Sequence, residues 1–517
     1  MDIQLNSIVL QNFQAIRDRT EIPIRPLTFL YGPNSSGKSA IHDALLYVDT
    51  VFSGGQHKNL LKRWRYRVPG ESEPREMQIA IAGKIVTNSF GFTNDRGADH
   101  LPDPFDLFLW NLRADRAERE PHSHLSFKIE ITALSNGCHL INLFIDDKCV
   151  LRCSANQMDL YQVKCEICTE FFSGALERVA QENGLDPDDS SSYSFTCKFP
   201  TNDLHFELTS RSELDESFLG WEKELLQPLN YTNFLCHLAN YYIGQFAALR
   251  FAPPLVDSDR GTILNDSMIW TDSAIESRLN THPTIAMLAK SYVASLKPTP
   301  HHDSLMNSET LPAEGLHKWV NRCLSDHLFL DQAYEITYAV YGLTPLPLPL
   351  TPEKGQVVNH LVECSLIDKV IRTTSFEDVG TGVSCLIPVL ASLHGPYSFI
   401  QQPELHLHPA LQAELGDVCI EATQLSGSPP KAVRHLIETH SENMLLRVLK
   451  RIRQTHLQYS VAPVLKIEAD DVCVLYFNPL PNGTTAIKHL RITEDGEFMD
   501  RWPSGFFAER DQEFQDE

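Results

Sequence analysis

The chain has 517 residues, of which 42% are hydrophobic and 21% are charged, and its formal net charge is −23. This composition is typical of an ordinary globular protein, and the length predicts two or three domains. The acidic balance disfavours non-specific contact with nucleic acid or anionic membrane, so any DNA contact would need a local basic patch.

The cellular compartment is predicted from the cysteines and the apolar runs. The 12 cysteines are scattered, mostly within apolar segments, which indicates reduced thiols. The N-terminus (MDIQLNSIVLQNF) alternates like a strand and does not resemble a secretory signal. No uninterrupted apolar run reaches about 18 residues, the length that a membrane-spanning helix needs. We therefore expect a cytoplasmic protein with no membrane association.

The first elements follow the order strand, loop, helix. Residues 3–9 alternate between apolar and polar side chains, and 27–31 (LTFLY) is a short apolar run that ends at a glycine. Both are predicted strands. Residues 39–48 (SAIHDALLYV) carry apolar side chains at helical spacing. A glycine-rich loop therefore connects a predicted strand to a predicted helix.

The middle of the chain changes character along its length. The stretch 125–210 is predicted to be rich in strands, with SFKIEITAL and FTCKF as candidates and an acidic, serine-rich loop at 182–194. From about residue 212 the apolar spacing becomes helical. Segments 297–315 and 345–355 are punctuated by prolines and are predicted loops or linkers.

The last third alternates strands and helices again. YSFI (397–400) is a predicted strand, and a helix with Leu411, Leu415 and Val418 inward follows it. HLIETHSENMLLRVLKRI (435–452) is a second strand and helix. Alternating units of this kind predict an α/β fold with a mostly parallel sheet covered by helices. We predict one domain made from both chain ends: 1–125 is the N-terminal lobe, 126–350 a mixed β/α insertion, and 351–517 the C-terminal lobe with a short tail.

The glycine-rich loop carries a phosphate-binding motif. Residues 32–39 (GPNSSGKS) fit the pattern G-x-x-x-x-G-K-[ST] in the context of strand, loop and helix that this motif requires. Backbone N–H groups and the helix N-terminus would point at the anion. In this pattern Lys38 reaches the β- and γ-phosphates of ATP, and Ser39 binds Mg²⁺. The candidate nucleotide-binding residues are Gly32, Pro33, Asn34, Ser35, Ser36, Gly37, Lys38 and Ser39.

This loop and several further stretches resemble a known family. LQNF and LTFLYGPNSSGKSAIHDAL are similar to ATPase heads of the RecF/SMC type within the ABC class. FEDVGTGVSCLIPVL (376–390), FIQQPELHLHP (399–409) and IETHSENMLLRVLKRI (437–452) resemble the stand-alone AAA15/AAA21 ATPases related to the OLD (overcoming lysogenisation defect) proteins. The segment 494–507 resembles the tail domain of one branch of that group. The resemblance, which covers about the first 50 and the last 150 residues, implies a P-loop ATPase head of the ABC type.

The resemblance implies roles for single residues. Gly380, Gly382 and Ser384 match the signature loop, which touches the γ-phosphate bound by a second subunit. His440 matches the switch histidine that hydrogen-bonds the γ-phosphate, and Ser441 could also cap the helix that follows it. Gln401 stands where an acidic residue usually holds Mg²⁺ through water.

Gln402 stands where the attacking water is polarised. An amide can orient a water but cannot take its proton, so we predict slow hydrolysis. Glu404 and Glu438 are the nearest carboxylates, and either could complete the site; Glu404 could instead stabilise a turn or helix start. The candidate catalytic residues are thus Lys38, Gln402, Glu404 and His440, and the candidate metal ligands are Ser39 and Gln401. ATP shared between two subunits would then hold a dimer or larger assembly together.

Three weaker patterns remain open. KNLLKRWRYR (58–67) and the basic side chains Arg447, Lys450, Arg451 and Arg453 could contact nucleic acid, or they could form solvated helix faces. CVLRC (149–153) and CEIC (165–168) could bind zinc, although their alternation favours strands with core thiols.

Three functions compete. Proteins of the resembled family act in defence against phage, often beside an effector nuclease, as in Septu-type and some retron systems; this chain offers only EADD (468–471) as an acidic cluster, so a nuclease would come from a partner. A RecF-like clamp on DNA is the second function, and possible DNA or RNA contacts belong to it. The third, the energy subunit of a transporter, would need LSGGQ and an intact acidic pair, and neither occurs.

Overall fold

The computed structural model describes residues 2–53, 75–86, 125–134, 139–145, 147–156, 159–167, 193–197, 255–257, 287–288, 291–292, 315–329, 334–343, 359–368, 373–374, 380–425, 433–459 and 462–502. The chain divides into two compact units. Unit 1 comprises Met1–Ile24, Pro33–Pro253 and Phe477–Ile487, and unit 2 comprises Arg25–Gly32, Pro254–Tyr476 and Lys488–Glu517. None of the helices in the described ranges combines the length and apolar character that a bilayer crossing requires.

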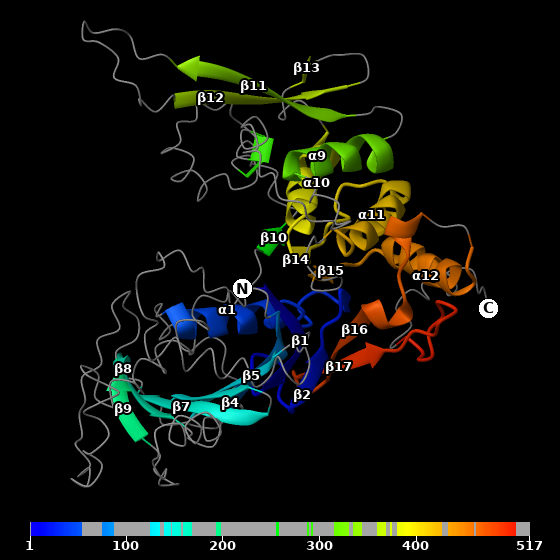
Figure 1. The fold of residues 1–517 in the computed structure, drawn as a ribbon. Helices are drawn as coiled ribbons and strands as arrows, with labels where there is room; N and C mark the ends of the chain where they lie inside the picture. The colour runs from blue at the N-terminus through cyan, green and yellow to red at the C-terminus, as the bar shows by residue number, and fades with distance from the viewer. Residues whose placement is uncertain are drawn as a thin grey trace, which may run out of the picture. The chain divides into compact units, whose positions relative to one another are not determined.

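Unit 1 contains an eight-stranded sheet in the order β2-β1-β4-β5-β6-β7-β8-β9 (Figure 1). Its strands are β1 (Asp2–Gln11), β2 (Thr20–Pro23), β4 (Met77–Val86), β5 (Leu125–Ala133), β6 (His139–Ile145), β7 (Lys148–Asn156), β8 (Asp159–Ile167) and β9 (Tyr193–Cys197). All neighbours are antiparallel. The strands predicted at 3–9 and in SFKIEITAL are confirmed in this sheet. Strand β9 confirms the first three residues of FTCKF, and its last two lie outside the described residues.

The helix α1 (Ala40–Ser53) of unit 1 follows the phosphate-binding motif. Ile41, Leu45 and Val48 are fully buried, which confirms the predicted inward stripe. The side-chain amide of Gln14 donates to Asp43 at 2.6 Å and ties the loop after β1 to the first turn of the helix. The order strand, glycine-rich loop, helix is therefore confirmed.

The second sheet has six strands in the order β10-β14-β15-β3-β16-β17 (Figure 1). They are β10 (Leu255–Asp257), β14 (Tyr397–Gln401), β15 (Arg434–Glu438), β3 (Leu27–Tyr31), β16 (Val472–Pro479) and β17 (Thr485–Leu490). The pairs from β10 to β16 are all parallel, which confirms the predicted, mostly parallel sheet. Strand β3, from the start of the chain, lies between two strands from its end. The α/β fold class and the joining of both chain ends in one sheet are thus confirmed.

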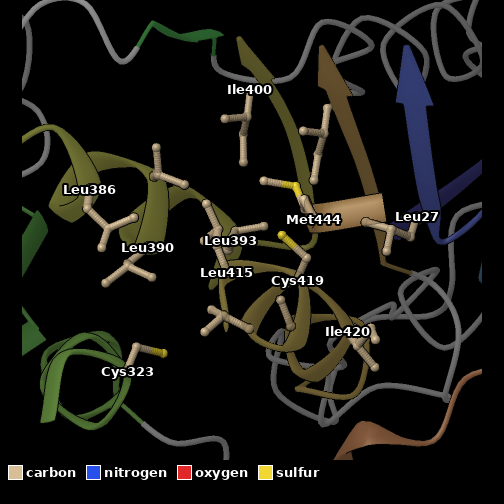
Figure 2. Close-up of a cluster of buried hydrophobic side chains, with 14 of the residues drawn as sticks. Leu27, Cys323, Leu386, Leu390, Leu393, Ile400, Leu415, Cys419, Ile420 and Met444 are labelled. Carbon is tan, nitrogen blue, oxygen red and sulfur yellow. The ribbon is translucent and has the colours of Figure 1, made fainter. Parts of the chain in front are cut away.

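Three helices of unit 2 bury their apolar faces in one core. They are α10 (Thr381–Leu393), α11 (Pro409–Ala422) and α12 (Glu442–His456). Figure 2 shows the cluster in which side chains of these helices meet those of β3 and β14. Leu415, Val418, Met444, Leu445, Val448, Leu449 and Ile452 are all buried, as their spacing predicted. Leu411, predicted inward with them, is half-buried and packs against the edge of this core.

The remaining elements of unit 2 extend this core. The helix α9 (Leu316–Arg322) continues into the π-helix η5 (Cys323–Leu328), and the buried Trp319 indole donates to the Leu390 carbonyl at 3.0 Å. A three-stranded antiparallel sheet consists of β11 (Glu335–Leu343), β12 (Asn359–Ile367) and β13 (Thr373–Thr374). Two 3-10 turns, η6 (Pro463–Leu465) and η7 (Ala469–Asp471), precede β16.

Several predicted features lie outside the described residues. They are the loop 182–194, the helical stretch from residue 212, most of 297–315, the break 345–355 and the basic segment 58–67. The division at 125/126 falls at the start of β5, which pairs with β4 in one sheet. The three-part domain division stays a prediction.

Candidate functional site

The candidate site lies at the carboxyl edge of the six-stranded sheet in unit 2. In the parallel register, Gln401 at the end of β14 pairs with Glu438 at the end of β15, and Glu438 pairs with Leu30 of β3. Tyr31 ends β3, and Gly32, the first residue of the phosphate-binding motif, follows it directly. Because the carboxyl ends of parallel strands share one edge, the motif begins beside the strands that carry Gln401 and Glu438.

The first of the two glutamines hydrogen-bonds a carboxylate. The Gln401 amide Nε2 lies 3.3 Å from Oε2 of Glu438, on the neighbouring strand. An amide beside a carboxylate presents its N–H to it, so Gln401 is a donor in this pair. A carboxylate is therefore present at this edge, one strand away from the expected position.

The second glutamine has an unusual backbone. Gln402 has φ +47°, in the left-handed region that non-glycine residues rarely adopt. Its N–H donates to the Glu438 carbonyl at 2.7 Å, which extends the ladder past the end of β14. This conformation turns the chain sharply away from the sheet edge. Strained backbone of this kind is common at functional sites.

Glu404 is not placed as an open catalytic carboxylate. Its side chain is 8% exposed, Oε2 accepts from the Thr439 hydroxyl at 2.7 Å, and Oε1 accepts from the His440 N–H at 2.7 Å. Burial raises the pKa of this carboxyl, and the hydrogen bonds from His440 and Thr439 oppose that rise. The contacts fit a residue that fixes the turn before α12, which is the structural alternative that the sequence left open.

The turn with His440 is held from several sides. The Thr439 N–H donates to the Leu30 carbonyl at 3.2 Å, and the Ser441 N–H donates to the Thr439 hydroxyl at 3.0 Å. Ser441 caps α12, because its hydroxyl accepts from Met444 N–H at 3.2 Å, so the predicted cap is confirmed. The backbone of the turn that carries His440 is thus fixed by hydrogen bonds within the chain.

Sequence reasoning missed Tyr31 at this edge. Its hydroxyl donates to the Ser441 carbonyl at 2.9 Å, and burial raises its pKa further above the ordinary value. No local pattern could have indicated this bond, because its partner lies in the last quarter of the chain. In the sequence, Tyr31 indicates only the apolar end of a predicted strand.

Residues of the phosphate-binding loop show the backbone of such a loop. Ser35 and Gly37 have φ values of +60° and +90°, in the left-handed region that phosphate-binding loops use. Lys38 is 4% exposed, and its amino group donates to the Pro33 carbonyl at 3.0 Å. Pro33, Asn34 and Ser35 are exposed.

Ser36 has one group that is bonded and one that is not. Its carbonyl accepts from the Thr485 hydroxyl at 2.8 Å. Its own hydroxyl is buried and has no hydrogen-bond partner among the residues that the structure describes. A buried polar group of this kind is costly unless a ligand or water satisfies it. Ser39 lies just before α1, and its carbonyl accepts from Asp43 N–H at 3.0 Å.

The predicted signature residues form the start of α10. Gly380 is the exposed N-cap, and a Cβ built on it would meet none of the described residues within 4 Å. A Cβ on Gly382 would lie 2.8 Å from the His406 carbonyl, so this glycine lets α10 approach the loop after Gln402. Ser384 is buried, and its hydroxyl donates to the Thr381 carbonyl at 3.1 Å. The structure therefore brings the signature segment against the loop that follows Gln402.

The histidines of LHLHP take structural positions at this loop. His406 has φ +61°, and His408 caps α11 by accepting from Ala410 N–H at 3.3 Å. Gln412, in the first turn of α11, donates to the Leu407 carbonyl at 3.1 Å and accepts from the Ser441 hydroxyl at 2.7 Å. Gln412 thus connects the loop that follows Gln402 to the turn of His440.

The basic face predicted on α12 is largely neutralised within the chain. Arg447 and Arg451 both bind Asp417 of α11 at 2.6 Å, and Arg453 binds Glu497 at 2.8 Å. The side chains of Arg447 and Arg451 are 19% and 18% exposed. The expectation that this face points outward is wrong for these two arginines, because they pair with a buried carboxylate. Lys450 is exposed.

The other weak signals occupy regular structure. CVLRC lies on β7 and CEIC on β8 except for Cys168, which lies outside the described residues; Cys153 and Cys165 are register partners. EADD forms a 3-10 turn closed by a capping box between Glu468 and Asp471. The strands agree with the alternation that the sequence analysis found in the two cysteine motifs.

Comparison with known proteins gives structural neighbours only. No protein-family model matches the chain, and no curated protein does. Solved neighbours include an Smc head bound to the C-winged helix domain of ScpA, at 11% identity and TM-score 0.42, covering 94% of this chain and 98% of the neighbour. The SMC head domain from Thermotoga maritima gives 10% identity, TM-score 0.36 and coverage of 95% and 100%.

An Smc head with a coiled coil and joint from Pyrococcus yayanosii gives 10% identity, TM-score 0.38 and coverage of 99% and 100%. With TM-scores from 0.36 to 0.42, these likenesses assign neither a family nor an activity to the chain.

Proposed function

We propose that the protein is a P-loop ATPase head of the ABC type that binds ATP and Mg²⁺, hydrolyses ATP slowly, and associates with copies of itself when ATP is bound. The observation that carries this proposal is the convergence at one sheet edge. The strand that leads into the phosphate-binding motif ends beside the strands that carry Gln401, Glu438 and the fixed turn of His440. Groups that meet at one sheet edge in this way suit a nucleoside triphosphate.

The nucleotide would be held by the phosphate-binding loop. Its positive-φ backbone at Ser35 and Gly37, the buried amino group of Lys38 and the unbonded hydroxyl of Ser36 all suit an anion. A bound phosphate group would give the buried Ser36 hydroxyl a hydrogen-bond partner. His440, on its fixed turn, would donate to the γ-phosphate.

The Mg²⁺ ligands would be Ser39 and Gln401, as the sequence predicts, together with Glu438. A hydroxyl, an amide oxygen and a carboxylate form an oxygen donor set of the kind that Mg²⁺ prefers. The ion, when bound, would neutralise charge on the phosphates. Of the two carboxylates that the sequence left open, Glu438 fits this role better, because both oxygens of Glu404 already accept hydrogen bonds.

Slow hydrolysis follows from the chemistry of Gln402. Its amide would orient the attacking water but could not accept the proton. Positioning and charge stabilisation supply most of the acceleration in phosphoryl transfer, so the reaction would be slowed and not abolished. A site that binds well and turns over slowly stays closed for long periods, and bound ATP then acts as a timer for assembly.

Self-association is supported by the start of α10. The described residues explain Gly382, whose Cβ would press on the His406 carbonyl. They do not explain Gly380, because a Cβ there would meet none of them and its φ of −55° suits any residue. An exposed glycine at a helix N-terminus leaves room for close approach of a phosphate held by another subunit. Gly380, Gly382 and Ser384 would form this contact surface.

The test is size-exclusion chromatography with light scattering, with and without ATP and Mg²⁺, beside a turnover assay. We expect ATP to increase the mass of the wild-type protein and to leave that of Lys38→Ala unchanged. Turnover should be well below the roughly 10 per second of a typical enzyme. No ATP binding, or turnover in the tens per second, would contradict the proposal.

The biological role rests on the resemblance of the motifs. We propose that the assembly controls a partner effector, a nuclease in antiphage defence, in the cytoplasm. The alternative is a RecF-like DNA clamp, which ATP-dependent binding of duplex DNA would reveal. The internal pairing of Arg447 and Arg451 and the net charge of −23 favour the first role.

A further inference from the structure

The last described segment of the chain forms a compact hairpin, residues 491–500. Ile492 and Phe498 form an antiparallel bridge, and Met499 N–H donates to the Arg491 carbonyl at 3.0 Å. The guanidinium of Arg491 and the carboxylate of Asp500 make two parallel hydrogen bonds of 3.1 Å. The hairpin is thus closed at both its middle and its base, so the chain leaves it in a defined direction.

The hairpin is fastened to α12 by a close backbone contact. Gly496 has φ +68°, and a Cβ built on it would clash with the Leu449 carbonyl, so only glycine fits there. Arg453 donates from Nε to the Asp495 carbonyl at 2.8 Å and from Nη2 to the Glu497 carboxylate at 2.8 Å. The hairpin therefore cannot shift along α12 without breaking these contacts.

Trp502, which follows the hairpin, packs on the end of β3. Its ring meets Tyr31 edge to face at 5.5 Å between centroids, and it also contacts Tyr476 at 6.2 Å and Phe498 at 5.2 Å. Such aromatic pairs restrict both rings and contribute about 0.5–1.5 kcal/mol beyond their buried area. Trp502 thus limits how the Tyr31 ring can move.

Tyr31 connects this contact to the candidate site. Its hydroxyl donates to the Ser441 carbonyl at 2.9 Å, one residue after His440, and its backbone leads directly into Gly32. One side chain therefore joins the C-terminal segment, the start of the phosphate-binding motif and the turn of His440.

We propose that Trp502 and Tyr31 are positioning residues for the nucleotide site: Trp502 orients Tyr31, and Tyr31 fixes the turn that presents His440. The expected effect on the rate of hydrolysis rests on the proposed ATPase function. The contacts that connect Trp502 to the turn are independent of that function. The C-terminal hairpin is then part of the machinery that sets the rate of hydrolysis, although it carries no group that touches ATP.

The experiment compares Trp502→Ala, Trp502→Phe, Tyr31→Phe and the double variant Trp502→Ala/Tyr31→Phe. Met499→Ala is the matched control, since Met499 lies on the same hairpin and is 60% exposed. Amide hydrogen exchange of residues 440–444 is measured without nucleotide. Single-turnover hydrolysis and ATP affinity are measured on the same proteins.

We expect Trp502→Ala and Tyr31→Phe each to speed exchange in 440–444 and to slow hydrolysis by about tenfold, because small misplacements of a catalytic group cost that much or more. ATP affinity should stay within about twofold of wild type, since Lys38 and the loop are untouched. Trp502→Phe should recover most of the rate, because an aromatic edge remains. Met499→Ala should match wild type.

The double variant decides whether the two residues act in one chain of contacts. Its loss should equal that of either single variant, because residues that act through one another are not additive. Additive losses, or normal exchange in Trp502→Ala, would overturn the proposal. If wild-type protein binds no ATP, the proposed function fails, and the exchange measurements still decide the link. If Trp502→Ala does not fold, Trp502→Phe and Tyr31→Phe decide it.

Discussion

The side-chain amide of Gln401 donates to the carboxylate of Glu438 across two neighbouring strand ends, at 3.3 Å. This pairing gives a physical reason for an amide where an acid is expected. A glutamate at 401 would place two carboxylates side by side, and like charges at this distance cannot both ionise easily. The acidic group at this edge belongs to β15, and the amide of β14 holds it in place.

The Gln401→Glu variant tests that relationship. Without Mg²⁺ it should lower the free energy of unfolding by roughly 1–2 kcal/mol, because one of two adjacent carboxyls must take up a proton or repel its neighbour. With Mg²⁺ the penalty should shrink, and ATP turnover should rise above wild type. Thermal unfolding with and without Mg²⁺, beside a turnover assay, measures both effects.

The matched control exchanges the two groups. Gln401→Glu/Glu438→Gln carries one carboxylate and one amide, like the wild type, so it should recover stability in the absence of Mg²⁺. If Gln401→Glu were as stable as the wild type, the carboxylates at 401 and 438 would not repel each other measurably.

Glu404→Gln should destabilise the turn before α12. The new NH₂ group would face either the Thr439 hydroxyl or the His440 N–H, and an unsatisfied buried donor costs about 1–3 kcal/mol. The exposed Glu442→Gln in the next helix turn is the control. Comparing their melting temperatures with wild type checks the effect.

The same variant has a pH dependence of known sign. Burial raises the pKa of Glu404 above its ordinary value of 4.5, so its contribution to stability is complete below that value and is lost as pH rises through the raised pKa. The difference in melting temperature between wild type and Glu404→Gln should therefore be largest at low pH and should decrease toward neutrality. A difference that grows with pH would contradict this account.

Gly382→Ala and Gly380→Ala separate packing from assembly. The first should lower stability by about 1–3 kcal/mol, because its Cβ would press on the His406 carbonyl at 2.8 Å. The second should change stability by less than about 0.5 kcal/mol, as its Cβ space is open. If Gly380 meets a second subunit, Gly380→Ala should still weaken ATP-dependent association. Light scattering and thermal unfolding of both variants distinguish these outcomes.

Asp417→Asn should be one of the most destabilising polar changes in unit 2. Asp417 is nearly fully buried and binds both Arg447 and Arg451, so its removal leaves two guanidiniums facing an amide. Breaking a buried ion pair in this way costs about 3–5 kcal/mol. Glu414→Gln, at a carboxylate that is 35% exposed, should cost less than about 1 kcal/mol. Chemical denaturation of the two variants gives the comparison.

Local patterns in the sequence predicted much of this fold. The strand at 27–31, the helix after the phosphate-binding motif and the inward residues of α12 follow from apolar spacing over one or two turns. The cap at Ser441 follows from its position between a strand and a helix. Each of these features depends on neighbours in the chain, and such features can be recognised without a structure.

The contacts that define the candidate site could not be predicted in the same way. Glu404 was ambiguous because its partners, Thr439 and His440, come from another strand, and the choice between catalysis and turn support depends on which atoms it meets. Arg447 looked like an outward charge because the sequence does not show that Asp417 lies opposite it. Long-range pairing decides these roles, and a single sequence carries little record of it.

Strand β3 has consequences for how the protein is made. Its neighbours in the sheet are β15 and β16, which are synthesised long after β3. Until then Leu27–Tyr31 is an apolar edge without its parallel partners, and edges of this kind attract foreign strands. The strand that leads into the phosphate-binding motif would therefore gain its second parallel partner only after residue 476 has been synthesised.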